Sequence, residues 1–242
     1  YNEPGRFTAF IGYEWTSQVP PGQNLHRVVV YRDGAAKASQ TVPATTYAPQ
    51  GSTDPEYLWE ILQAYEDKTG GDLLAIAHNG NLSNGLMFPE INPVTGRRLT
   101  KEYAETRASM EPLIEMMQVK GNSEVVPQFW QADEFADFEN ATTIQDYNDR
   151  VFQKQNFIRY GLGRGLKYRA DLGTNPFKYG FVGGTDNHNG SPGNVAEDNY
   201  MVGSHGLHLL VRRAGVVLQS VFGGDGGEFI VTWVEGQSDL LL

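Results

Sequence analysis

The stretch of residues 54–81, DPEYLWEILQAYEDKTGGDLLAIAHNGN, contains a helix, a buried strand and a polar loop in immediate succession. Asp54 and Pro55 predict the start of the helix, because a carboxylate caps the first turn and proline fits there. Apolar residues then recur at helical spacing until a pair of glycines ends the pattern. The apolar run 73–77 predicts a fully buried strand, and His78 opens the polar segment that follows.

The same alternation of apolar runs and helical stretches extends along the rest of the chain. Further elements are predicted as strands at residues 7–13, 27–31, 113–119 and 179–183 and as a short helix near residues 101–108. Thr143 predicts the start of a second long helix, which the glycines from Gly161 onward are expected to end. This order indicates a one-domain α/β protein with a mainly parallel sheet, open or barrel-shaped.

The composition is that of a folded acidic protein. Among its 242 residues, 19 Lys plus Arg stand against 29 Asp plus Glu, which gives a formal net charge of −10. That charge argues against a nucleic acid or an anionic membrane as a partner held by bulk electrostatics. The lack of cysteine excludes disulfides, thiolate catalysis and cysteine-ligated metals, and no apolar run approaches the roughly 20 residues of a membrane helix.

Acidic and imidazole side chains lie next to the ends of the predicted strands. These residues are Glu14, His26, His78, Glu124, Asp186 and His188. The carboxyl ends of parallel strands meet at one edge of a sheet or barrel, so we expect these side chains to gather there. Carboxylate oxygens and neutral imidazole nitrogens suit Zn²⁺, Mn²⁺ or Fe²⁺, and the pattern therefore predicts a metal site.

Other polar residues near these ends are candidates for contacts with substrate. They are Arg27 and Lys178 as cations for a phosphate group, and Asn79, Asn81 and Asn187 as groups that orient substrate or water. Surface charge and the preference of Asn for turns explain the same residues equally well. The chain contains no G-x-S-x-G elbow, no phosphate-binding P-loop and no G-x-G-x-x-G fingerprint.

Five separated blocks within residues 1–206 read FTAFIGYEWTS, NLHRVVVYRD, AIAHNGNLSNGLMF, EMMQVKGNSE and NPFKYGFVGGTDNHNGSPGNVAEDNY. These blocks, in this order, resemble the DUF3604 family, a branch related to the PHP (polymerase and histidinol phosphatase) superfamily. The resemblance implies a distorted, PHP-like (β/α) barrel with two or more divalent ions, Zn, Mn or Fe, at the strand ends. It assigns the metal ligands to Glu14, His26, His78, Asp186 and His188, and a catalytic position to Glu124.

Two departures from the family pattern shape the expected domain organisation. No GDLHxHT-like segment with its paired histidines precedes Tyr1, so we expect a barrel that is incomplete at its N-terminus. Residues 207–242 do not resemble the family, so we expect a partial hydrolase domain at residues 1–206 and a C-terminal segment of uncertain relation to it.

The resemblance implies a metal-dependent hydrolase, and the first hypothesis is a phosphoesterase that attacks small phosphate mono- or diesters with metal-bound hydroxide. Arg27 and Glu124 are its candidate catalytic residues. One alternative is a non-catalytic barrel that binds a metal or a partner, and another is a carbohydrate-binding protein that stacks sugars on its four tryptophans. Family members often look exported, which favours a periplasmic or secreted location. The sequence does not specify the substrate, the metal or the oligomeric state.

Overall fold

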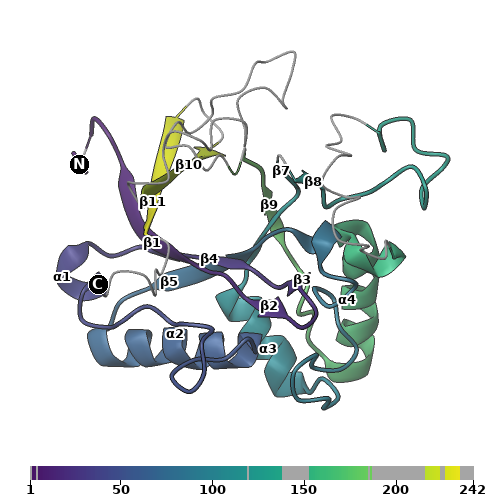
Figure 1. The fold of residues 1–242 in the computed structure, drawn as a ribbon, viewed down its shortest axis with the longest axis horizontal. Helices are drawn as coiled ribbons and strands as arrows, with labels where there is room; N and C mark the ends of the chain where they lie inside the picture. Colours follow the sequence, from purple (N-terminus) through teal and green to yellow (C-terminus); the bar gives the residue numbers. More distant parts are fainter. Residues whose placement is uncertain are drawn as a thin grey trace.

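A mixed seven-stranded sheet forms the centre of the protein (Figure 1). The structure is a computed structural model that describes residues 2–3, 5–118, 120–137, 153–184 and 186, and the backbone of residues 216–223 and 227–234. The strands, in their order across the sheet, are β10 (Val216–Gly223), β11 (Gly227–Val234), β1 (Ala9–Trp15), β4 (Arg27–Tyr31), β5 (Leu73–Ala77), β6 (Leu113–Glu115) and β9 (Gly180–Val182).

The remaining elements are short pairs of strands and the helices. Two small two-stranded sheets pair β2 (Gln18–Val19) with β3 (Gln23–Asn24) and β7 (Met117–Gln118) with β8 (Gly121–Asn122). The helices are α1 (Ala35–Ala38), α2 (Pro55–Thr69), α3 (Lys101–Met110), α4 (Ile158–Leu172) and the 3₁₀ turns η1 (Gly80–Leu82) and η2 (Lys154–Asn156). Within the described part of the chain, no helix combines the length and apolar character that crossing a bilayer requires.

The α/β class is confirmed, but the prediction of a mainly parallel sheet is wrong. Strand β4 runs antiparallel to both β1 and β5, whereas β5, β6 and β9 run parallel to one another. The segment between β1 and β4 contains only the short β2–β3 hairpin, so β4 can return antiparallel without a helical crossover. The described strands form an open sheet and do not close into a barrel.

Strand alternation divides the side chains of the sheet between two faces. One face carries Tyr13, Trp15, Val29, Tyr31 and Ala75, which pack with the buried residues of α2 and α3. The opposite face carries Val28 and Ile76, with partly buried Val30, Leu74 and Leu113 around them. Figure 1 shows α2 and α3 on the same side of the sheet. A residue's position along its strand therefore decides whether it enters the helical core or the other face.

Helix α2 forms as its sequence predicts. The Asp54 carboxylate accepts a hydrogen bond from the amide of Glu56 at 3.0 Å, and Pro55 occupies the first helical position. The helix ends at Gly70, whose φ of 58° is left-handed and favours glycine. The strand at residues 73–77 and the short helix after Thr100 are also confirmed.

Helix α4 differs from its prediction at both ends. Position 143 lies outside the described residues, α4 begins at Ile158, and the glycines from Gly161 onward lie inside it. A Cβ atom at Gly161 would overlap the Phe88 ring, and one at Gly165 would overlap the side chain of Asn175. These glycines therefore permit close packing instead of ending the helix.

One further strand prediction is changed by the structure, and two strands are found in the C-terminal segment. The strand predicted at residues 113–119 ends at Glu115, and the β7–β8 hairpin follows it. The backbone of β11 pairs in parallel with β1, with Ala9 opposite Ile230, so part of residues 207–242 contributes to the main sheet. The division into residues 1–206 and 207–242 stays a prediction.

Candidate metal centre

Three side chains that can ligate a metal meet at one end of three neighbouring strands of the sheet. Glu14 is near the end of β1, His78 follows the end of β5, and His26 precedes the start of β4. Because β4 is antiparallel to both neighbours, its start lies at the same edge as their ends. The backbone amide of His78 donates to the carbonyl of His26 at 3.2 Å, which continues the ladder between the two histidines.

The Glu14 carboxylate lies between the two imidazoles. Its Oε1 is 3.1 Å from Nδ1 of His26 and 3.2 Å from Nε2 of His78. The two rings stand edge to face with centroids 5.5 Å apart. One ligand atom from each residue lies within 4.8 Å of the other two, which makes this a group able to hold a metal ion.

Burial and hydrogen bonding set the charges of this group. Burial raises the pKa of Glu14, but the hydrogen bonds from His26 and His78 outweigh it and hold its pKa well below the usual range. Burial lowers the pKa of His26, and the attraction of Glu14 offsets this only in part. An anionic carboxylate beside a neutral imidazole is the protonation state that divalent metals require of these ligands.

The donor set and its spacing fit a divalent transition metal. Ligands at about 2.0–2.2 Å from a tetrahedral ion are roughly 3.3–3.6 Å apart, close to the two Glu14–histidine distances of 3.1 and 3.2 Å. Two histidines and one carboxylate also form the ligand set of many catalytic zinc sites, which leave a position for water or substrate. Nε2 of His26 and Nδ1 of His78 are buried and have no hydrogen-bond partner among the residues that the structure describes.

The predicted Asp186–His188 pair is only partly described. The side chain of Asp186 is buried, its backbone has a left-handed φ of 52°, and its carboxylate forms an ion pair with Lys120. Asp186 does not belong to the group within 4.8 Å. His188 and Asn187 lie outside the described residues.

Arg27, predicted as a catalytic cation, points into the helical core. Its side chain is fully buried, and its Nε donates to Oε1 of Glu111 at 2.8 Å. Arg27 lies on β4 with Val29 and Tyr31 on the core face, whereas Glu14 pairs with Val28 on the opposite face. The Arg27 side chain therefore points away from the face that carries Glu14, and its catalytic role stays a prediction.

The other predicted residues occupy varied positions. Glu124 pairs with Arg159 at 2.7 Å, and Lys178 is exposed. Asn81 is buried, with its amide donating to the carbonyl of Lys120 at 3.0 Å and accepting from Ser123 at 3.0 Å. Asn79, next to His78, is buried with a left-handed φ of 55°, and within the described ranges neither polar atom of its side-chain amide has a partner. The hydrogen bonds of Asn81 thus stabilise the loop that follows β5, while Asn79 has a buried side-chain amide next to the centre.

Sequence reasoning missed two charged residues near the centre, Glu115 and Lys120. Burial raises the pKa of Glu115, although the nearby charges of His78 and Lys120 partly counter this. Lys120 also acts electrostatically on His26. The signal for Glu115 was a carboxylate inside the apolar run LIEMM, since a buried charge in such a run needs a partner. Lys120 lies directly before β8, in the connection that joins it to β7.

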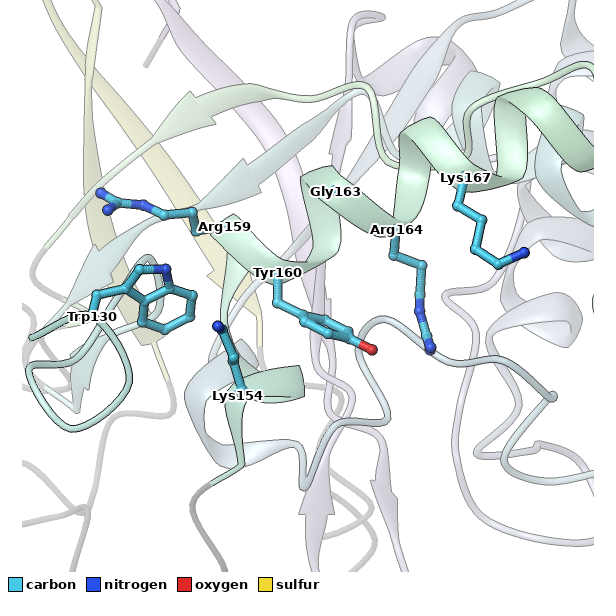
Figure 2. A pocket seen from close by; sticks show the side chains of 7 residues that line it. All are labelled: Trp130, Lys154, Arg159, Tyr160, Gly163, Arg164 and Lys167. Atoms are coloured by element: carbon cyan, nitrogen blue, oxygen red, sulfur yellow. The ribbon is translucent and has the colours of Figure 1, made fainter.

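A groove of about 440 Å³ lies away from this centre, along α4 (Figure 2). Its lining residues are Trp130, Lys154, Arg159, Tyr160, Gly163, Arg164 and Lys167. Lys154 lies over the Trp130 ring. Arg159 pairs with Glu124 and Asp133, Arg164 pairs with Glu90, and Lys167 pairs with Asp171. Four carboxylates thus balance four cations, and this balance leaves little net charge to attract an anion.

Comparison with known proteins gives one match. The family model described as "Protein of unknown function (DUF3604)" matches residues 1–215, which is most of the chain. No curated protein and no solved structure shows a significant match.

Proposed function

The chain belongs to the DUF3604 family, and from this premise we propose that it is a metal-dependent hydrolase of phosphate esters. Glu14, His26 and His78 would hold a divalent ion, Zn, Mn or Fe. The observation that carries the proposal is the convergence of these side chains from three adjacent strands. Asp186 and His188 are included as ligands of the same or a second ion.

The proposal includes the relationship to the PHP superfamily and its distorted barrel. That relationship is supported by the ligand order along the chain and by the position of the ligands at a single sheet edge. The described residues contribute an open mixed sheet to such an architecture.

The residues of the centre favour hydrolysis of an anionic ester. A divalent ion supplies Lewis acidity, which polarises the phosphoryl group and lowers the pKa of coordinated water. Without a metal, hydrogen bonds from His26 and His78 hold the pKa of Glu14 below its usual range, so its carboxylate is anionic and can ligate a divalent ion. Lys120 adds a positive charge beside His26 and the Asp186 carboxylate, which favours a substrate that carries phosphate.

Metal binding tests the first half of the proposal. The purified chain would be incubated with Zn²⁺ or Mn²⁺, desalted and subjected to elemental analysis by mass spectrometry. We expect near-stoichiometric metal in the wild type and loss of it in Glu14→Gln and His78→Ala. Glu105→Gln, a change in an exposed carboxylate of α3, should bind as the wild type does. Full metal occupancy in either ligand variant would overturn the assignment.

Catalysis tests the second half. Bis-(p-nitrophenyl) phosphate, p-nitrophenyl phosphate and p-nitrophenyl acetate represent phosphodiesters, phosphomonoesters and carboxylic esters. Metal-dependent hydrolysis of a phosphate probe, lost in Glu14→Gln, would support the phosphoesterase. Metal binding with no turnover of any probe would favour a metal-binding protein instead.

A further inference from the structure

The strand register places a second carboxylate, Glu115, directly beside His78. Strands β5 and β6 run parallel, and Ala77 pairs with Ile114. The next residue along each strand is His78 on one and Glu115 on the other, and paired positions direct their side chains to the same face. The charge of His78 acts on the Glu115 carboxylate, which agrees with this placement.

Each of these two side chains has one buried polar atom that finds no hydrogen-bond partner in the described part of the chain. The atoms are Nδ1 of His78 and Oε1 of Glu115. Both residues are 6% exposed, so water satisfies these atoms poorly. A buried donor or acceptor without a partner costs free energy, and a donor and an acceptor on neighbouring positions satisfy each other if they meet.

The opposite nitrogen of His78 faces the metal centre. Its Nε2 lies 3.2 Å from Oε1 of Glu14. A histidine that ligates through Nε2 carries its proton on Nδ1, and in metal sites that Nδ1–H commonly donates to a carboxylate. Such a hydrogen bond fixes both the tautomer and the orientation of the ring.

We propose that Glu115 is a positioning residue that accepts a hydrogen bond from Nδ1 of His78 and so directs Nε2 toward the metal. This inference rests on the proposed metal centre. The two side chains leave neighbouring positions of adjacent parallel strands, which places the carboxylate beside the ring. Glu115 also interacts with the charge of Lys120, the side chain of Gln118 and the backbone amide of Asn79.

The test compares Glu115→Ala and Glu115→Gln with Glu105→Gln. The last variant is the control, because it also removes a carboxylate, but an exposed one on α3 that pairs with Lys101. Zn²⁺ affinity is measured by competition with a chromophoric chelator. The His78 tautomer is read from long-range ¹H–¹⁵N spectra, with His78→Ala to assign the signal, and thermal melts report folding.

We expect Glu115→Ala to weaken Zn²⁺ binding about 10- to 100-fold. Glu115→Gln should lose less, because its amide oxygen still accepts from Nδ1–H, and Glu105→Gln should bind as the wild type does. The wild-type spectrum should show His78 protonated at Nδ1, and this preference should weaken in Glu115→Ala. An unchanged affinity and tautomer in Glu115→Ala would overturn the inference.

Failure of the metal centre gives a different result. If the wild type binds no Zn²⁺, the proposed function fails, and the inference, which rests on the metal centre, is overturned with it. Zn²⁺ binding that Glu115→Ala leaves unchanged overturns the inference alone. If Glu115→Ala does not fold, the tautomer and affinity of Glu115→Gln provide the same comparison.

Discussion

Replacing Glu111 by Gln tests the buried ion network beneath the metal centre. Glu111 is 1% exposed, and its carboxylate contacts Arg27 at 2.8 Å and Arg107 at 3.1 Å. Its Oε1 also accepts from Nε1 of Trp59 at 2.9 Å. In Glu111→Gln two buried guanidinium groups, normally held by one carboxylate, lose their anion.

The structure sets the expected size and order of the effects. Removing one partner of a buried ion pair costs about 3–5 kcal/mol, because the remaining charge stays buried. For a chain of this size, each kcal/mol shifts Tm by roughly 2–4 °C, so Glu111→Gln should lower Tm by roughly 6–20 °C. Arg27→Met should cost less than Glu111→Gln, since it leaves one balanced pair between Glu111 and Arg107.

Urea unfolding followed by tryptophan fluorescence and circular dichroism measures these differences. Lys101→Met is the control, because the Lys101–Glu105 pair is 64% and 53% exposed and should contribute less than about 1 kcal/mol. If the free energy of unfolding falls no more in Glu111→Gln than in Lys101→Met, the proposed contribution of the buried ion pairs is refuted. A loss of activity in Arg27→Met with unchanged stability would restore Arg27 as a catalytic residue.

Three further predictions concern pH, packing and metal removal. Burial raises the pKa of Glu111, but the attraction of Arg27 and Arg107 outweighs it and holds the pKa below its ordinary value. The unfolded state therefore binds more protons, and the free energy of unfolding should fall as pH drops below about 4.5. Urea midpoints measured from pH 7 to 3 should fall less steeply in Glu111→Gln than in the wild type. Gly161→Ala should destabilise by about 1–3 kcal/mol, because its Cβ overlaps the Phe88 ring, whereas Gly163→Ala, with open space at that position, should be neutral or stabilising in the same unfolding assay. Chelation of the metal-loaded protein should lower its Tm, because the protein loses about 2.7 kcal/mol of stability where free metal had been 100 times its Kd. The Tm of His78→Ala should not respond to the chelator. A decrease of equal size in His78→Ala would place the ion elsewhere.

Local signals predicted the parts of the fold that depend on local interactions. The start of α2 follows from Asp54 and Pro55, and its end from Gly70, because capping involves residues a few positions apart. The run 73–77 predicted β5 from hydrophobicity alone. The direction of β4 could not be read in this way, because strand pairing depends on partners far along the chain.

Tertiary packing explains the predictions that failed. Gly161 looks like a helix terminator in the sequence, but Phe88, distant in sequence, requires a residue without a side chain there. Arg27 looked like part of the site because it follows His26, yet strand alternation sends it to the opposite face. Glu14, His26 and His78 were predicted as ligands from their positions beside strand ends, and the structure brings them together.

The position of β4 within the sheet has a consequence for local unfolding. The three strands that carry the ligands are interior strands, since β11 covers β1 on one side and β6 covers β5 on the other. Fraying of a sheet begins at its edges, where backbone amides exchange with solvent most readily. The amides of Val29 and Ala75 should therefore be among the slowest to exchange deuterium. The spacing of the three ligands is therefore maintained when the edge strands of the sheet unfold locally.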